Sequence, residues 1–387
     1  MGKIYTALGL MSGTSMDGVD ASIIQTDGKS KYRPILDKYF KYPKSIYNNL
    51  TVLRDKIKTS KDLKKYQKKI KSVEKDITTF HAESVEKILK KTKTNLDFIG
   101  FHGQTIYHNA EKKITKQLGD GKLLSKLTKK KVVYDFRQND LKNNGQGAPL
   151  TPIFHKLLIN QNKIPLPVII LNIGGIANVT IVNKEKNISC YDIGPGNCLI
   201  DEWIRINSKN NYDKNGKIAR LGRTNIKILK KMLKKNKKTK HVKQLSFDIK
   251  DFDLSFVRDL SLKDGTATLT NFTGNLLANQ ISIILSNEYE RHWPKIKTFK
   301  QWKILVCGGG RKNKTLMKTI NKGFGANINL LINMFKSIDI FNIDGDFVES
   351  QAFGYLAIRS YLKLPISFPE TTGCKKPSTG GALIKNY

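Results

Sequence analysis

A polar turn near the start of the chain, between two apolar strands, constrains the fold more than any other feature of this sequence. Residues 4–8 and 19–24 are apolar with the alternation typical of strands. Residues 12–18 between them are rich in Gly, Ser and Thr, so we expect a tight hairpin turn. Glycines let a ligand approach the backbone closely, and successive backbone N–H groups in such a turn can bind an anion.

Two carboxylates, Asp17 and Asp20, flank this turn, and the hydroxyl groups of Ser12, Thr14 and Ser15 add hydrogen-bond donors. Donors for phosphate beside carboxylates for Mg²⁺ are the groups that a phosphoryl-transfer site requires. The turn is not a Walker loop, whose G-x-x-x-x-G-K-[ST] pattern begins a helix. From composition alone, an ordinary glycine-rich hairpin explains these residues equally well.

Length and composition favour a two-domain cytosolic protein. At 387 residues, two domains of ordinary size are expected, and 39% apolar residues are enough for packed cores. We find no secretory apolar region, and Gly and Asn interrupt the most apolar later stretch, residues 165–182, which we interpret as a buried strand pair. The four cysteines form no C-x-x-C pattern, so we expect reduced, buried thiols.

The net charge of +37 has two explanations. One is binding to nucleic acid or to an anionic surface. The other is a general drift of composition, because the lysines are spread through the whole chain. The densest run, residues 227–243, contains no Phe, Tyr or Trp that could stack on bases. We therefore favour drift, with weak non-specific affinity for polyanions as a side effect.

Several motifs together resemble one known family. Residues 9–20 match the N-terminal signature of the anhydro-N-acetylmuramic acid kinase family, G-x-M-S-G-T-S-x-D-G-V-D, at every fixed position. Further similarities are H-G-Q-T at 102–105, D-F-R at 135–137, G-Q-G-A-P-L at 145–150, D-x-G-P-G-N at 192–197 and D-x-x-A-T-L-T at 264–270. The chain departs from the family at Asn144, where a glycine is more usual. The resemblance covers nearly the whole chain.

The resemblance implies an α/β fold of two ribonuclease-H-like domains, of the actin and hexokinase type, with an ATP cleft between them. The sequence agrees with a duplication, since residues 168–182 have the same order of strand, glycine turn and return strand as residues 4–24. We expect residues 1–150 with 350–387 to form the first domain and residues 151–349 the second. Further strands are predicted at 32–41, 98–101, 131–134 and 302–307, helices over 45–91, and helix starts near 151, 198, 264 and 346.

The activity that the resemblance implies is an ATP-dependent kinase reaction. Such a kinase hydrolytically opens 1,6-anhydro-N-acetylmuramic acid and phosphorylates it to N-acetylmuramic acid 6-phosphate, in cell-wall (peptidoglycan) recycling in the bacterial cytoplasm. Its partners are ATP with Mg²⁺ and the sugar acid; we expect no specific nucleic acid and no membrane, and allow for a homodimer. The alternatives are another sugar kinase or ATPase of the same superfamily and a basic nucleic-acid-binding protein.

The resemblance also implies roles for individual residues. Asp192 would be the catalytic general base, although its position before a Gly-Pro-Gly turn by itself favours a helix N-cap. Mg²⁺ would bind at Asp17 or Asp20. The implied ATP and phosphate residues are Gly13, Thr14, Ser15, Met16, Asp17, Gly18, Val19, Asp20, Gly194, Gly196, Asn197, Gly308, Gly309 and Gly310. The expected substrate contacts are His102, Gln104, Asp135, Arg137, Gln146 and Glu349, with Arg137 as a candidate carboxylate clamp.

Overall fold

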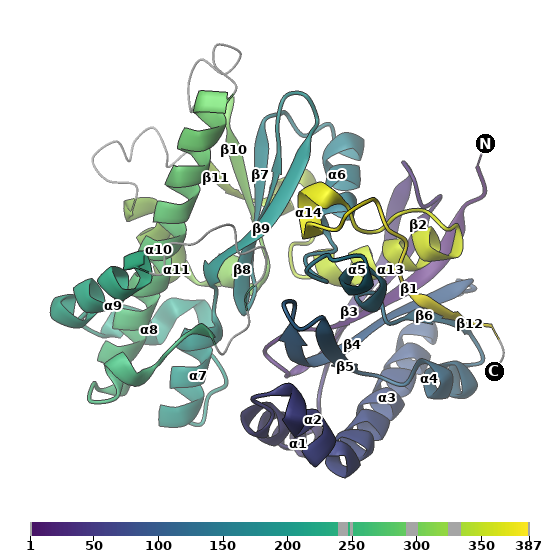
Figure 1. The fold of residues 1–387 in the computed structure, drawn as a ribbon, viewed down its shortest axis with the longest axis horizontal. Helices are drawn as coiled ribbons and strands as arrows, with labels where there is room; N and C mark the ends of the chain where they lie inside the picture. The colour runs from purple at the N-terminus through teal and green to yellow at the C-terminus, as the bar shows by residue number, and fades with distance from the viewer. Residues whose placement is uncertain (1, 239–246, 248–250, 292–300, 324–333, 386–387) are drawn as a thin grey trace. The chain divides into compact units, whose positions relative to one another are not determined.

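The structure, a computed structural model, describes residues 2–238, 247, 251–291, 301–323 and 334–385 (Figure 1). The chain divides into two compact units, Met1–Ile164 with Phe347–Tyr387, and Pro165–Asp346. Each unit is an α/β structure built on one mixed sheet. The α/β class predicted from the sequence is confirmed.

The sheet of the first unit begins with the expected hairpin. Strand β1 (Tyr5–Ser12) pairs antiparallel with β2 (Gly18–Thr26), and β2 pairs antiparallel with β3 (Tyr32–Lys41). On its other side β1 pairs parallel with β4 (Phe98–Asn109), and β4 pairs parallel with β6 (Lys131–Tyr134). The strands β5 (Ile114–Leu118) and β12 (Ala382–Ile384) add antiparallel to β4 and β6. The central order is therefore β3-β2-β1-β4-β6.

The sheet of the second unit repeats this order. Its strands are β7 (Val168–Ile173), β8 (Ile176–Val182), β9 (Ile188–Pro195), β10 (Lys303–Cys307) and β11 (Phe335–Ser337). They lie in the order β9-β8-β7-β10-β11, with the first three antiparallel and the last two parallel to β7. Two copies of one strand order, third-second-first-fourth-fifth, confirm the predicted duplication of a ribonuclease-H-like unit.

Helices cover both faces of the first sheet. The helices α1 (Lys44–Lys56), α3 (Gln67–Leu89) and α4 (Gly121–Thr128) pack on one face, in an apolar core that includes Leu10, Ile77 and Phe101. Helix α13 (Val348–Tyr361) lies on the other face, directly on Gly9 and Gly100. A Cβ added to Gly9 would lie 1.8 Å from the carbonyl oxygen of Ser350, so the helix backbone can approach only because no side chain intervenes.

Helix α6 (Pro152–Gln161) also belongs to the first unit, beyond residue 150, where the sequence predicted a domain boundary. The reason is local pairing with β3. The backbone N–H of Tyr32 donates to Oε1 of Gln161 at 2.8 Å, and Nε2 of Gln161 donates to the carbonyl of Tyr32 at 2.6 Å. The short elements of this unit are α2 (Ser60–Lys65), α5 (Gln138–Lys142) and α14 (Pro369–Thr372).

The second unit has its helices around the long α10. They are α7 (Cys198–Asn207), α8 (Lys217–Leu221), α9 (Ile226–Lys238), α10 (Leu262–Arg291) and α11 (Lys314–Lys322), with 3₁₀ turns η1 (Lys214–Gly216), η3 (Ser255–Val257), η5 (Gly309–Lys312) and η7 (Ile338–Phe341). Leu277, Ile281 and Leu285 of α10 pack on the apolar face of the sheet. The lysine-rich run begins in α9, and its residues 239–243 lie outside the described residues.

Two further features of the fold concern membrane-spanning helices and the cysteines. Among the residues that the structure describes, none of the helices combines the length and apolarity needed to cross a membrane. The four cysteines, Cys190, Cys198, Cys307 and Cys374, are buried and free, as expected.

Candidate functional site

The turn between β1 and β2 is open at its first residues. A Cβ added to Gly13 would have one neighbour within 4 Å among the described residues beyond its chain neighbours, Oγ of Ser15 at 4.0 Å. Within the described part of the chain, the backbone N–H groups of Thr14 and Ser15 have no hydrogen-bond acceptor. Two adjacent unpaired donors beside an open glycine are the arrangement that binds a phosphate oxygen.

The later residues of the turn are part of the protein core. Met16 has a left-handed backbone (φ 57°), and its side chain is only 3% exposed. Val19 is fully buried in the same apolar cluster. Gly18 must be a glycine for packing, because a Cβ there would lie 2.4 Å from the carbonyl of Phe40 and 2.6 Å from the ring of Tyr39. Of the residues expected at phosphate, these three therefore build the turn.

The two carboxylates lie at the end of the turn, and both are half-buried. Asp17 accepts a short hydrogen bond from the hydroxyl of Ser15. Its carbonyl accepts from the backbone N–H of Tyr42 at 2.8 Å and from the hydroxyl of Tyr39 at 3.0 Å. Asp20 lies on β2, opposite Met11 of β1. The turn therefore has a fixed end that carries negative charge.

Ser12 differs from the expectation that its hydroxyl is a phosphate donor. The residue is 2% exposed, and its Oγ lies 2.8 Å from Oη of Tyr42 and 3.2 Å from Nε2 of His81. Its hydroxyl is therefore used inside the core. The sequence could not show this, because both partners lie far along the chain.

His102, within β4, and Arg137, just after the end of β6, form one unit. Nδ1 of His102 lies 2.8 Å from the carbonyl of Gly103, which can only accept, so Nδ1 carries the proton. Nε2 then accepts from Nε and Nη2 of Arg137 at 3.1 and 2.9 Å. Burial and the charge of Arg137 lower the pKa of His102 well below its usual value. His102 is thus a buried neutral histidine that orients the guanidinium of Arg137.

The G-Q-G loop is organised by Asp140, which the sequence analysis missed. Asp140 is 1% exposed, and its carboxylate accepts from the backbone N–H of Gly147 and from the hydroxyl of Thr372, both at 2.7 Å. The carbonyl of Gly147 in turn accepts from Nη1 of Arg137 at 2.8 Å. Asn144 has φ 64°, the left-handed conformation that favours the glycine usual at this place. The sequence did contain one indication of this role, because Asp140 is an acidic residue in the spacer between D-F-R and G-Q-G.

The other residues expected to contact the substrate lie at different places in the first unit. Nε2 of Gln104 donates to the carbonyl of Gly13 at 2.9 Å, and its buried Oε1 has no partner among the described residues. Gln146 is half-buried and donates its backbone N–H to the carbonyl of Thr372 at 2.8 Å. Asp135 is exposed, and Glu349 is half-buried in the first turn of α13. Gln104 thus joins the turn between β1 and β2, while Arg137, His102 and the G-Q-G loop form a second group.

In the second unit, the glycine turn between β7 and β8 and the glycine turn after β9 are hydrogen-bonded to each other. The backbone N–H groups of Gly196 and Asn197 donate to the carbonyls of Gly175 and Gly174 at 2.9 and 2.8 Å. A Cβ on Gly196 would lie 2.2 Å from the carbonyl of Gly174. Gly194 has φ 145°, which favours glycine. Gly174 and Gly175 were seen only as a hairpin turn in the sequence, and the structure adds them to this group.

Asp192 lies within β9, and the N-cap of α7 is Asn197, so the N-cap interpretation of Asp192 is wrong. Its Oδ2 accepts the backbone N–H of Phe247 at 2.7 Å. The strand register aligns Asp192 with Asn178 of β8, and Asn178 with Asn172 of β7. Three polar side chains therefore form a row on one face near the turns, away from the apolar residues of the core.

The triple-glycine turn after β10 leaves one position open. A Cβ on Gly309 meets nothing within 4 Å in the part of the chain that the structure describes, whereas one on Gly310 would lie 2.2 Å from Cγ2 of Ile173. Gly308 has φ 78°, and its Cβ would lie 2.4 Å from Oδ1 of Asn172. Gly309 is the exposed member of the three. A ligand can approach the backbone most closely there.

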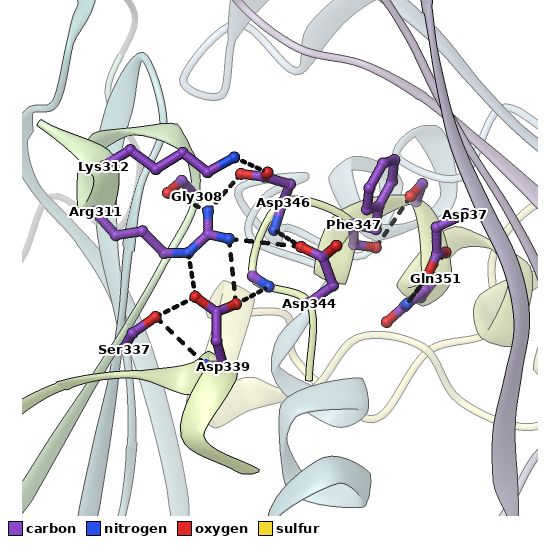
Figure 2. Close-up of polar contacts among 12 residues, drawn as sticks. Asp37, Gly308, Arg311, Lys312, Ser337, Asp339, Asp344, Asp346, Phe347 and Gln351 are labelled. Atoms are coloured by element: carbon purple, nitrogen blue, oxygen red, sulfur yellow. Dashed lines mark hydrogen bonds and ion pairs between the residues drawn. The ribbon is translucent and has the colours of Figure 1, made fainter. Parts of the chain in front are cut away.

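A buried arginine holds this turn in place (Figure 2). Arg311 donates to Asp339 at 3.0 Å, to Asp344 at 3.5 Å, to Asp346 by a shorter bond, and to the carbonyl of Gly308 at 3.2 Å. Burial alone would raise the pKa of Asp339, but hydrogen bonds from Arg311 and Ser337 lower it to about 2. The sequence analysis gave Arg311 no role, because its three aspartates lie 28 to 35 positions later.

The comparisons with known proteins give the family. The family model "Anhydro-N-acetylmuramic acid kinase" matches residues 5–386. The chain belongs to the anhydro-N-acetylmuramic acid kinase family. A relative of that name from Pelagibacter ubique (strain HTCC1062) is 54% identical over 389 residues, covering 100% of both chains. Another from Agrobacterium fabrum (strain C58 / ATCC 33970) is 34% identical over 393 residues, again covering 100% of both.

Membership in the anhydro-N-acetylmuramic acid kinase family confirms the predicted enzyme class, an ATP-using kinase. Among solved structures, a ROK family glucokinase from Streptomyces griseus in complex with glucose and AMPPNP is 11% identical, with a TM-score of 0.40 and coverage of 91% and 99% of the two chains. A reductive activator for a corrinoid, iron-sulfur protein is 10% identical, with a TM-score of 0.47 and coverage of 92% and 60%. The fold assignment rests on the strand order of the two sheets.

Buried histidines in the first unit are expected to make this kinase sensitive to acid. Burial lowers the pKa of His81, His108 and His155 to about 4, and burial also lowers the pKa of His102 well below its usual value. The unfolded chain, with histidine pKa near 6.5, takes up protons first as pH falls. The free energy of unfolding should therefore decrease from about pH 6.5 toward about pH 4, by up to ~1.4 kcal/mol per pH unit for each histidine. Urea unfolding at several pH values measures this slope, and a flat profile would contradict it.

Proposed function

We propose that the backbone N–H groups of Thr14 and Ser15 hold phosphate oxygens of ATP and that Asp192 is the general base of the reaction. The observation that carries the phosphate role is the open turn itself. Gly13 leaves room for a ligand, and the two N–H groups after it have no acceptor among the described residues. Backbone donors bind the oxygens of phosphate without sequence-specific side chains.

The sugar substrate that we propose is 1,6-anhydro-N-acetylmuramic acid. Asp192 takes a proton from a water molecule, whose oxygen attacks the anomeric carbon. The bond from this carbon to the bridging oxygen breaks, and the oxygen stays on C6 as the nucleophile. It attacks the γ-phosphorus of ATP, so that ADP leaves and N-acetylmuramic acid 6-phosphate forms. One water, one sugar and one ATP are consumed in each turnover.

The surroundings of Asp192 support the role of base. The residue is half-buried in a central part of β9, where strand pairing fixes its backbone. One carboxylate oxygen is oriented by the N–H of Phe247 at 2.7 Å. A base must be held in hydrogen-bonding reach of the proton that it removes, and a carboxylate on a strand is held more firmly than one on a loop. The neighbouring glycine turns at 174–175 and 194–196 bring backbone groups close to this position without side chains.

The anionic group of the sugar acid is proposed to bind at Arg137. Its contacts with His102 and with the carbonyl of Gly147 orient the guanidinium plane. A guanidinium held in this way is suited to a carboxylate, which it can bind through two parallel hydrogen bonds. Gln104, Asp135, Gln146 and Glu349 stay predicted substrate contacts.

Mg²⁺ is proposed to accompany ATP at Asp17 or Asp20. The described residues contain no group of three or more His, Cys, Asp or Glu side chains arranged for a metal ion. Mg²⁺ in kinases is normally bound by one or two carboxylates together with phosphate oxygens and water. Two half-buried aspartates at the end of the phosphate turn fit this requirement. When bound, the ion would neutralise charge on the phosphates.

The setting of the reaction is also proposed from the family. A cell-wall recycling kinase that uses ATP is expected in the bacterial cytoplasm, and the relatives named above come from bacteria. A homodimer stays a prediction.

The substitution Gly309→Val tests the proposal that the triple-glycine turn contacts the nucleotide. No atom of the described residues beyond the chain neighbours lies within 4 Å of the added Cβ, so the melting temperature should be close to that of the wild type. Because the new side chain occupies the space over the turn, KM for ATP should rise by about tenfold or more, with KM for the sugar nearly unchanged. Gly310→Val is the control, since its Cβ would lie 2.2 Å from Ile173 and should lower the melting temperature. An unchanged KM for ATP in Gly309→Val would show that the triple-glycine turn does not contact the nucleotide.

A further inference from the structure

A buried chain of three polar side chains lies at the base of the phosphate turn in the first unit. Oη of Tyr42 lies 2.8 Å from Oγ of Ser12, which lies 3.2 Å from Nε2 of His81. Their exposures are 4%, 2% and 0%. The three residues come from different elements, since Ser12 ends β1, His81 is in α3, and Tyr42 lies between β3 and α1. Neither the proposed chemistry nor the sequence motifs give His81 or Tyr42 a role.

The protons in this chain have fixed positions. Nδ1 of His81 lies 2.8 Å from the carbonyl of Ile77, which can only accept, so this nitrogen carries a proton. Burial lowers the pKa of His81 to about 4, so the ring is neutral and Nε2 is an acceptor. The hydroxyl of Ser12 therefore donates to His81. Burial raises the pKa of Tyr42, so its hydroxyl stays protonated and donates to Ser12.

Tyr42 also contacts the other end of the same turn. Its backbone N–H donates to the carbonyl of Asp17 at 2.8 Å. One residue thus holds the turn at Ser12 through its phenol and at Asp17 through its main chain. Between these two points lie Thr14 and Ser15, whose N–H groups have no acceptor in the part of the chain that is described. The direction of those groups depends on where the ends of the turn are held.

We infer that His81 and Tyr42 are positioning residues for ATP, which hold both ends of the turn so that its open N–H groups face the phosphates. This inference rests on the proposed phosphate role of the turn. Preorganised donors act without the entropic cost of ordering a loop when the ligand binds. Loss of either positioning residue should therefore weaken ATP binding while the site of the sugar is preserved. A purely structural role would lower stability and leave the two KM values in their normal ratio.

The experiment compares His81→Leu, His81→Gln and a matched control, His155→Leu. The control removes another fully buried, neutral histidine of the same unit, in α6. We expect His81→Leu to raise KM for ATP by about tenfold, with KM for the anhydro sugar changed by less than about twofold. His81→Gln should recover most of the loss, because its amide oxygen can accept the hydrogen bond from Ser12. His155→Leu should lower the melting temperature without changing either KM.

A second variant keeps the inference testable if His81→Leu does not fold. Tyr42→Phe removes only the hydroxyl and retains the ring, whose centroid packs 5.1 Å from that of Phe80. It should raise KM for ATP by about threefold to tenfold, the effect of one hydrogen bond of about 1 kcal/mol. A normal KM for ATP in this variant, or an equal rise in KM for the sugar, would overturn the inference. If Gly13→Val loses ATP turnover while these variants bind ATP normally, the turn keeps its role and the positioning role alone is refuted. ATP turnover retained in Gly13→Val would refute the role of the turn itself, and the inference with it.

Discussion

Asp192→Asn is expected to lower kcat by at least about 10²–10⁴-fold, which is the usual contribution of a general base. Asparagine has the shape of aspartate but cannot take the proton from water. In the wild type the backbone N–H of Phe247 donates to the carboxylate at 2.7 Å. The amide oxygen of asparagine can accept the same hydrogen bond, so the variant should fold. Nucleotide affinity should survive, because the proposed phosphate donors belong to the turn after β1. Steady-state kinetics, nucleotide titration and a melting curve on this one variant measure all three quantities.

A buried structural aspartate of the same unit provides the matched control. Asp213 is 4% exposed, and its carboxylate accepts the backbone N–H groups of Ile218 and Ala219 at 2.8 and 3.0 Å. Asp213→Asn should lower the melting temperature and leave kcat near that of the wild type, because the lost hydrogen bond stabilises the start of α8. If Asp192→Asn behaves like this control and turns over the sugar within a few-fold of the wild type, the base lies elsewhere.

Gly13→Val is expected to reduce kcat/KM for ATP by about 10²–10⁴-fold, to the point where turnover is hard to detect. The added side chain would stand where a phosphate must approach, and two charge-assisted hydrogen bonds of about 1.5–3 kcal/mol each would be lost. The fold should tolerate the change, because among the described residues beyond its chain neighbours the new Cβ approaches only Oγ of Ser15, at 4.0 Å. ATP-dependent phosphorylation and melting temperature are the two measurements.

Gly18→Val, two residues before the end of the same signature, distinguishes binding from folding. Its Cβ would lie 2.4 Å from the carbonyl of Phe40, so this variant should lose stability before it loses anything specific to ATP. A folded Gly13→Val protein with normal ATP turnover would show that the open turn does not hold the phosphates.

The sequence was sufficient where the relevant information is local. The hairpin around residue 13 and its repeat around residue 174 were predicted because alternating apolar residues and glycine turns identify them within a few positions. The start of α7 after the Gly-Pro-Gly turn and the start of α6 at Pro152 were predicted for the same reason. The duplicated fold was predicted from the resemblance of several motifs to one family. The family comparison confirmed that resemblance.

The parts of the site that the sequence did not predict depend on contacts between distant residues. Ser12 was expected to face a ligand, but Tyr42 and His81 use its hydroxyl inside the core. Asp140 holds the G-Q-G loop through Thr372, which lies 232 residues away in the sequence. No propensity or spacing rule predicts such pairs, because folding alone brings the two side chains together. The same limit applies to Asp192, whose role as a helix cap was excluded only when its place in β9 was known.

This kinase is expected to add water to the anhydro sugar while it transfers the γ-phosphate of ATP. The most direct test incubates the protein with ATP and 1,6-anhydro-N-acetylmuramic acid in ¹⁸O-labelled water and determines the mass of the phosphorylated sugar and of its fragments. We expect a product that has gained one phosphate and one water, with the heavy oxygen on the anomeric carbon and an unlabelled oxygen between C6 and phosphorus. Unlabelled N-acetylmuramic acid 6-phosphate kept in the same water measures any exchange at the anomeric carbon. A phosphorylated product that still contains the anhydro bridge, or a labelled oxygen at C6, would contradict this expectation.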